Sequence, residues 1–241
     1  EIIMAALLLS CSAMLSFSLR APVGSASLST PAAARATIVA ASEDVGRRQA
    51  IATAVVATSV LSVPQAAQAS YPSLSVMTTE GEMQFELWDD VAPKHVASFL
   101  KLAKEGFFDG GAFHRIIPGF VIQGGDPNVK LGYGPDGTLD GGDKKQIRKW
   151  GTGGPGYTIP AEFNPRPHEF GVLSMARAAD PNSAGSQFFV CLGRLNSLDN
   201  KYTTFGKLTK GEDVLKRIAA AQTVQGDIPF KRQGIERVDA L

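Results

Sequence analysis

The stretch from Phe113 to Asp126, which reads FHRIIPGFVIQGGD, decides how this chain folds. It holds two short apolar segments, Phe113 to Ile117 and Phe120 to Gln123, separated by Pro118-Gly119. Apolar runs of this length, rich in β-branched and aromatic residues, favour strands over helices. We therefore predict two strands here, within a chain built mainly from strands.

On the N-terminal side of this stretch, the sequence predicts a hairpin and a helix. Apolar and polar residues alternate from Leu74 to Leu87 around a turn at Glu80-Gly81, which indicates two strands with one buried face. Pro93 suits the first position of a helix, and Gly106 suits its end. The apolar residues between them keep the helical spacing: Val96, Phe99, Leu100 and Ala103.

On the C-terminal side, the sequence predicts further strands and a second helix. Glu212 and Asp213 favour a helix N-terminus, and an apolar face follows at Val214, Leu215, Ile218 and Ala219. The other β-type segments are Gly171 to Ala176, Gln187 to Leu192, Tyr202 to Leu208 and Gly234 to Ala240. Because closure removes exposed strand edges, we predict a mainly β fold: a closed eight-stranded antiparallel barrel capped by two α-helices.

Residues 126–160 are rich in glycine and poor in apolar residues, so we predict a long surface loop or pair of loops there. It includes an insertion from Lys130 to Trp150. Gly132 to Gly137 and Gly151 to Gly156 both match the dinucleotide-binding pattern G-x-G-x-x-G. A proline interrupts each match and no helical run follows, so neither is interpreted as a nucleotide site.

Residues 1–69 have the composition of a bipartite targeting region, and residues 70–241 form the predicted folded domain. The first part suits an organelle transit segment, with no acidic residue from Ile2 to Ser42. Then Arg47-Arg48 precedes an apolar stretch from Ala50 to Val63 and a small-x-small site at Ala67-Gln68-Ala69, which resembles a twin-arginine signal. This order predicts the plastid thylakoid lumen. A bacterial-type exported protein and a membrane anchor are the alternatives, although a stretch of fourteen residues is short for a span.

Charge gives no indication of nucleic-acid binding. Residues 1–69 hold four of the 24 Lys+Arg and three of the 23 Asp+Glu, which leaves 20 of each in the predicted domain. The basic cluster Lys144, Lys145, Arg148 and Lys149 is interpreted as a solvated loop rather than a polyanion site. We expect no stable membrane span in the mature protein.

Metal, cofactor and nucleophile chemistry are not predicted either. The three histidines lack zinc-ligand spacing, and the acidic residues of the glycine-rich region lack the EF-hand order. Cys191 lies in the apolar run Phe188 to Leu192, where a thiol behaves as a small buried hydrophobe. No second cysteine is left in the predicted domain to form a disulfide.

Two blocks, FHRIIPGFVIQGGD (113–126) and LSMARAADPNSAGSQFFVCL (173–192), with LDNKYTTFGKL (198–208) after them, closely resemble the cyclophilin family. The resemblance covers residues 71–241 in the correct order, and GTGGPGYTIPAEF (151–163) is similar to bacterial and plastid members. It implies a peptidyl-prolyl cis/trans isomerase that acts on proline-containing segments of client proteins and assists their folding. Because rotation about an amide makes and breaks no bond, such an enzyme needs no cofactor.

The resemblance also implies roles for individual residues. Arg115 matches the family's catalytic arginine, whose rigid N–H groups can donate to the proline nitrogen as the amide twists. Phe120 and Gln123 are the other expected catalytic residues. The expected substrate-binding residues are Val121, Ala176, Arg177, Ala178, Gln187, Phe189, Leu198 and Tyr202. Phe188 should point the opposite way from Phe189, into the interior.

Several positions depart from the family pattern. Val121 replaces a methionine, Arg177 an asparagine, Ser197 a tryptophan and Tyr202 a histidine. Without the indole at position 197, we expect weak cyclosporin binding together with retained isomerase activity. The alternative function is a binding module that grips proline segments without useful turnover. The protein is expected to be a monomer.

Overall fold

The computed structural model describes residues 71–241, so the predicted targeting region at residues 1–69 lies outside the described residues. Among residues 71–241, no helix is both long enough and apolar enough to cross a membrane. The helices are α1 (Pro93–Lys104), α2 (Lys144–Ile147) and α3 (Glu212–Ala219), with 3-10 turns η2 (Pro127–Lys130), η3 (Pro181–Ser183) and η4 (Asn196–Leu198).

Nine strands form one antiparallel sheet in the order β3-β11-β1-β2-β8-β6-β7-β5-β4. Two short strands pair separately as β9 (Thr223–Val224) and β10 (Ile228–Pro229). The nine are β1 (Ser73–Thr78), β2 (Gly81–Leu87), β3 (Gly111–Ala112), β4 (Arg115–Ile117), β5 (Val121–Gly124), β6 (Val172–Met175), β7 (Phe188–Cys191), β8 (Thr204–Lys210) and β11 (Gly234–Ala240).

The mainly β prediction is confirmed, but the closed eight-stranded barrel capped by two helices is wrong. The sheet is open and has nine strands, and residues 71–241 contain three α-helices. The edge strands β3 and β4 are consecutive in the chain and separated only by Phe113 and His114. One extended segment thus pairs with β11 at its start and with β5 at its end, so the two edges form no ladder with each other.

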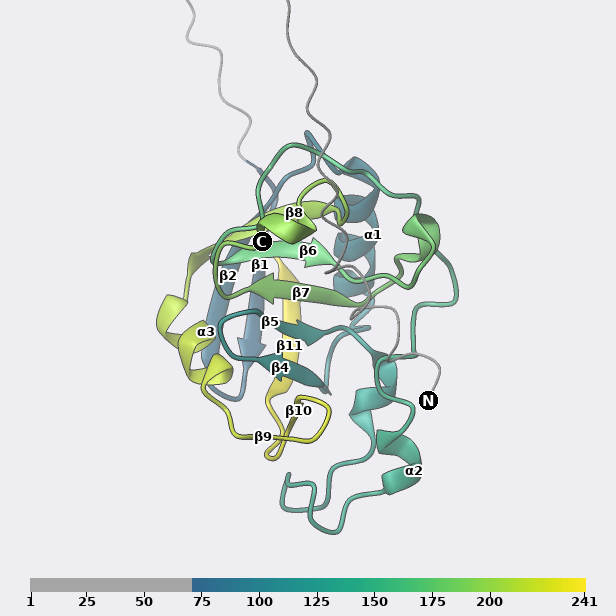
Figure 1. Ribbon diagram of the computed structural model, residues 1–241, viewed down its shortest axis with the longest axis vertical. Coiled ribbons are helices and arrows are strands. Elements are labelled where there is room, and N and C mark those ends of the chain that lie inside the picture. Colours follow the sequence, from purple (N-terminus) through teal and green to yellow (C-terminus); the bar gives the residue numbers. More distant parts are fainter. Residues whose placement is uncertain (1–70) are drawn as a thin grey trace, which may run out of the picture. The chain divides into compact units, whose positions relative to one another are not determined.

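The concave face of the sheet holds the main core. Apolar residues of the β1–β2 hairpin are buried at alternate positions, as predicted, because side chains alternate between the faces of a strand. Ser75 in β1 is buried as well. Phe188 lies in this core, where its ring meets those of Phe99, Phe108 and Phe113 edge-on. In Figure 1, α1 lies to the right and α3 to the left of the strands, and both contribute buried residues to this core. Both predicted helices are confirmed.

Glu162 caps the N-terminus of α1 from a distant loop. Its carboxylate accepts hydrogen bonds from the backbone N–H groups of Lys94 and His95, because Ala92 at the N-cap has no side-chain acceptor. The His95 Nδ1 atom lies 2.6 Å from the same carboxylate. The segment around Glu162 is therefore held firmly against the helix.

The insertion from Lys130 to Trp150 is ordered by its own contacts. Asp143 caps the short helix α2 by accepting from the backbone N–H groups of Lys145 and Gln146. The rings of Tyr133 and Trp150 lie 4.9 Å apart, and the Tyr133 hydroxyl donates to the carbonyl of Pro229. In Figure 1, α2 lies below the sheet, apart from α1 and α3.

Candidate active site

The convex face of β5, β6 and β7 carries a second apolar cluster, which we call the outer cluster. Its buried members are Trp88, Val121, Val172, Phe189, Cys191 and Leu198. Half-buried residues that pack against them include Phe120, Ala176 and Tyr202. Six of the residues predicted to form the site therefore meet here, although they come from three separate parts of the chain: Phe120, Val121, Ala176, Phe189, Leu198 and Tyr202.

Arg115 lies on the same face as the outer cluster. In the β4–β5 ladder it stands opposite Gln123, which stands opposite Phe189 in the β5–β7 ladder. Directly opposed residues of antiparallel strands project from the same face. The Arg115 Nε atom donates to Asp227 Oδ2 at 3.3 Å, while no hydrogen bond within residues 71–241 uses its two terminal nitrogens. Asp227 thus holds the guanidinium by one edge and leaves the other edge available.

A chain of hydrogen bonds holds the two predicted glutamines. Gln123 Nε2 donates to Gln187 Oε1 at 3.1 Å, and Gln187 Nε2 donates to the carbonyl of Gly153 at 2.8 Å. Gly153 is held in turn by buried Asp126, whose carboxylate accepts from the backbone N–H groups of Gly151 and Gly153. The glycine-rich loop therefore fixes the side chains of the site through Asp126. Sequence reasoning did not assign this role to Asp126.

The edge segment 176–178 borders the cluster. The Ala176 N–H donates to the carbonyl of Gln187, and the Arg177 guanidinium donates to the carbonyls of Lys201, Ala178 and Ala179. The Arg177 guanidinium carbon also lies 4.7 Å from the centroid of the Tyr202 ring. Arg177 thus ties the edge segment to Tyr202 instead of pointing into solvent, and Ala178 is exposed beside it.

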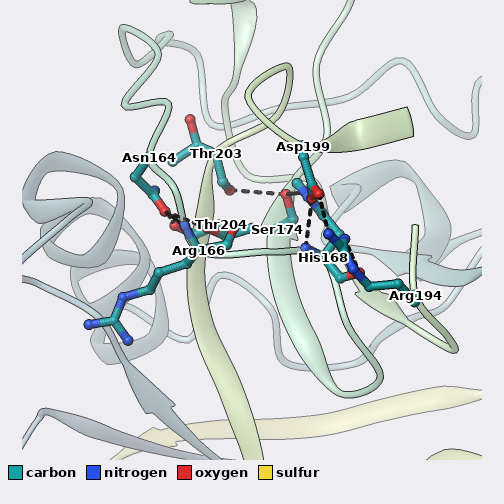
Figure 2. Close-up of polar contacts among 8 residues, drawn as sticks. All are labelled: Asn164, Arg166, His168, Ser174, Arg194, Asp199, Thr203 and Thr204. Carbon is teal, nitrogen blue, oxygen red and sulfur yellow. Dashed lines mark hydrogen bonds and ion pairs between the residues drawn. The ribbon is translucent and has the colours of Figure 1, made fainter. Parts of the chain in front are cut away.

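A buried polar network lies behind the outer cluster and was missed at the sequence level (Figure 2). His168 is fully buried, with Nδ1 at 3.0 Å from Asp199 Oδ1 and Nε2 at 2.9 Å from Ser174 Oγ. Ser174 donates to the carbonyl of Thr203, and Arg194 donates to Asp199 Oδ2 at 2.5 Å. The Arg194 hydrogen bond is the main cause that lowers the pKa of Asp199, while burial lowers the pKa of His168.

Burial also governs the other titratable side chains near the site. It lowers the pKa of His114 to about 4, against an opposing effect of Asp126, and it raises the pKa of the Cys191 thiol to about 12. Cys191 is therefore a packing residue and not a thiolate nucleophile. Residues 71–241 contain no group of three or more histidine, cysteine, aspartate or glutamate side chains placed to hold a metal ion.

The fold and the outer cluster define a mainly β protein with one apolar surface patch beside an arginine and two amides. The sequence model of the family described as "Cyclophilin type peptidyl-prolyl cis-trans isomerase/CLD" matches residues 73–240. The chain therefore belongs to the cyclophilin-type peptidyl-prolyl cis/trans isomerase family. Its activity is that of a peptidyl-prolyl cis/trans isomerase, as the names of its relatives also indicate.

Curated relatives named for this activity include bacterial proteins. A probable peptidyl-prolyl cis-trans isomerase of Brucella suis is 41% identical over 175 residues, which cover 71% of this chain and 84% of the relative. The isomerase of Synechococcus elongatus is 45% identical over 139 residues, 58% of this chain and 81% of the relative. Isomerase B of Bacillus subtilis is 45% identical over 140 residues, 57% of this chain and 83% of the relative.

A solved structure shares the fold. The cyclophilin-type isomerase of Cryptosporidium parvum, crystallised in the presence of the dipeptide Ala-Pro, superposes with a TM-score of 0.60 at 30% identity. The match covers 70% of this chain and 98% of that one.

Proposed function

We propose that Arg115 and the outer cluster form the surface on which the chain accelerates rotation about X-Pro peptide bonds. The observation that carries this proposal is the placement of Arg115, Gln123 and Phe189 in one row across β4, β5 and β7. A charged donor, an amide and an apolar ring thus lie side by side on one face.

The chemistry needs only selective stabilisation of the twisted amide. The rotation barrier of roughly 18–20 kcal/mol comes from amide resonance, which is lost when the bond twists. The proline nitrogen then regains a lone pair, and the terminal N–H groups of Arg115 donate to it. Because Asp227 holds only Nε, the guanidinium is oriented while its donors stay available. An interaction made only with the twisted amide lowers the barrier without tightening ground-state binding.

The outer cluster holds the proline ring while the preceding residue turns. Phe120, Val121, Phe189 and Leu198 supply apolar contact, and Gln187 and the edge segment 176–178 bind the substrate backbone. The Cryptosporidium parvum relative was solved in the presence of Ala-Pro, which supports a proline-containing segment as the ligand. The clients are unfolded or partly folded proteins, on which the enzyme acts as a folding assistant and as a monomer.

The decisive experiment compares wild type with Arg115→Ala in a prolyl-peptide isomerisation assay. We expect kcat/KM to fall by about 10²-fold or more, as when one donor to a developing lone pair is removed. The unfolding free energy should change by less than about 1 kcal/mol, because the Arg115–Asp227 pair is partly exposed. Asp227→Asn is the matched control: it removes the charge of the ion pair, keeps an oxygen that can accept from Nε and orient the guanidinium, and should retain most of the activity.

If Arg115→Ala matches wild type in this assay and in cells, this mechanism is wrong and a binding module for proline segments is favoured. Weak cyclosporin binding belongs to the same proposal. Ser197, which is exposed beside Leu198, offers neither the area nor the N–H donor of an indole.

The site of action in this proposal is the plastid thylakoid lumen. The support is the order of signals in residues 1–69 and the start of the family match at residue 73, just beyond the small-x-small site at Ala67-Gln68-Ala69. N-terminal sequencing of the protein from isolated lumen tests this, with Ser70 as the expected first residue. Recovery of the protein only outside the plastid would contradict it.

A further inference from the structure

The buried network behind the outer cluster contacts or adjoins three of the residues assigned to substrate binding. The His168 ring stacks on the Phe189 ring, with centroids 6.1 Å apart and planes 17° apart. Asp199, which accepts from His168, follows Leu198 in the chain, and Thr203, whose carbonyl accepts from Ser174, follows Tyr202. Phe189 and Tyr202 also meet edge-on at 5.8 Å.

The connectivity of Ser174, His168 and Asp199 is that of a nucleophile, a base and an acid. Geometry excludes this role. Ser174 has no exposed surface, its hydroxyl donates to the carbonyl of Thr203, and the ring of Phe189 covers the imidazole. A substrate cannot reach the hydroxyl, so the network needs another explanation.

The network adds side-chain contacts to segments that backbone bonds already join, such as the Leu195 N–H to the His168 carbonyl and the β6–β7 ladder, in which Ser174 stands opposite Phe189. His168 lies in an irregular segment before β6, Ser174 on β6, and Asp199 directly after the short turn η4. The backbone N–H of His168 also donates to Asp199 Oδ1, and Arg194 donates to both Asp199 and the carbonyl of His168. A single buried imidazole thus links β6, β7 and the η4 turn by two side-chain hydrogen bonds and one ring contact.

Burying an imidazole and a carboxylate next to an apolar surface costs free energy unless every polar atom is paired. Here each ring nitrogen of His168 and each carboxylate oxygen of Asp199 lies within hydrogen-bonding distance of another polar atom. An apolar side chain at position 168 could hold the ring of Phe189 and would keep the backbone bond to Asp199, but it would lose the side-chain contacts with Asp199 and Ser174. The imidazole adds these directional contacts.

From this geometry we infer that His168 is a positioning residue for the isomerase reaction. It sets the separation between the Phe189 ring and the Leu198–Tyr202 segment, which together receive the proline ring in the proposed function. The inference rests on the proposed function, since it assumes that the outer cluster receives the proline. Because the Phe189 ring and the Leu198–Tyr202 segment contact the substrate equally in the ground state and the transition state, displacing them should raise KM more than it lowers kcat.

The test uses the full chain with two substitutions that remove different parts of the contact set. His168→Phe keeps a ring against Phe189 but loses both hydrogen bonds, and His168→Asn keeps a donor near Asp199 but loses the ring. Both should raise KM by about tenfold with kcat within about threefold of wild type, because small displacements of binding groups cost up to about 10²-fold.

Two further variants control for general destabilisation. Ile218→Ala opens the main core under α3, away from the outer cluster, and should leave KM and kcat of the folded protein unchanged. Arg194→Gln removes the exposed end of the network, so it should fold normally and raise KM by about twofold.

The inference is overturned if both histidine variants fold with the KM of wild type, or if Ile218→Ala raises KM as much as they do. If neither histidine variant folds, Arg194→Gln decides, and an unchanged KM refutes the role. A wild-type chain without turnover would instead refute the proposed function. The dissociation constant of an Ala-Pro-containing peptide, measured by calorimetry, then replaces KM as the readout for the same variants.

Discussion

The two faces of β5, β6 and β7 carry apolar clusters that differ in what surrounds them. The main core on the inner face is enclosed by α1, α3 and the rest of the sheet. Within it, the Phe99 ring contacts the rings of Phe108, Phe188 and Phe205. The outer cluster is bordered by half-buried Phe120 and Tyr202, by Arg115 and Gln123, and by the His168 network. The inner face is filled for stability, whereas the outer face keeps apolar side chains and polar donors together, as the proposed substrate site requires.

Adjacent residues on β7 provide the strongest test of this division. Phe188→Ala should lower the unfolding free energy by about 3–5 kcal/mol, because it leaves a closed cavity. Phe189→Ala should cost less, about 2 kcal/mol, since half-buried neighbours such as Tyr202 can move into the space that the ring leaves. Denaturant unfolding of the two variants measures the difference.

The effects on activity should have the opposite order: Phe189→Ala should lose more activity than Phe188→Ala. Phe189→Ala should reduce kcat/KM by about tenfold or more, which corresponds to about 1.4 kcal/mol of transition-state binding. Phe188→Ala should leave kcat/KM of the folded fraction near that of wild type. If the two variants lose activity in proportion to their lost stability, the division between the faces does not hold.

Lowering the pH should reduce the unfolding free energy through protonation of His114, which lies between β3 and β4 in the chain. This side chain is buried, and its pKa of about 4 lies below the ordinary value near 6.5. A depressed histidine pKa stabilises the fold above the unfolded-state pKa, and this stabilisation is lost as the pH falls from about 6.5 towards 4. Between pH 7.5 and 5, His114 should account for about 2 kcal/mol of lost unfolding free energy.

The matched variant is His114→Gln, which does not titrate. Between pH 7.5 and 5, its unfolding free energy should fall by about 2 kcal/mol less than that of wild type. Equal slopes in the two proteins would mean that other groups cause the acid sensitivity.

The smallest expected effect concerns the open side of the outer cluster. Ser197→Trp should tighten cyclosporin binding by about tenfold, because an indole adds apolar area and an N–H donor beside Leu198. Calorimetry measures the dissociation constant, with Asn196→Trp on the same turn as the control for nonspecific apolar contact. A nanomolar constant for the wild-type chain would contradict the expected weak binding.

Much of the fold could be predicted because its signals are local. The β1–β2 hairpin and α1 and α3 follow from periodicity and from Pro93 and Gly106 at the helix ends. Helix α2 was missed because its four residues show no apolar face and lie in a glycine-rich region. The predicted strand count and the predicted closure were wrong because one extended segment contains both β3 and β4. Its start pairs with β11 and its end pairs with β5, which the sequence does not reveal.

The site could be predicted in part for the same reason. Resemblance located Phe120, Val121, Phe189, Leu198 and Tyr202, and the structure brings them into one cluster. Nothing in the sequence marked His168, a lone histidine between Pro167 and Glu169. Its partners lie 6 and 31 residues away, and no short motif joins them.

By itself, the sequence determined the family and placed Arg115, Gln123 and Phe189 on strands. Those assignments need only spacing along the chain. The tertiary structure alone decided that the sheet stays open, that Asp126 holds the glutamines through Gly153, and that a buried imidazole joins Phe189 to the turn after Leu198. The reason is physical: these features depend on groups far apart in the chain that meet only when the two faces of the sheet are packed.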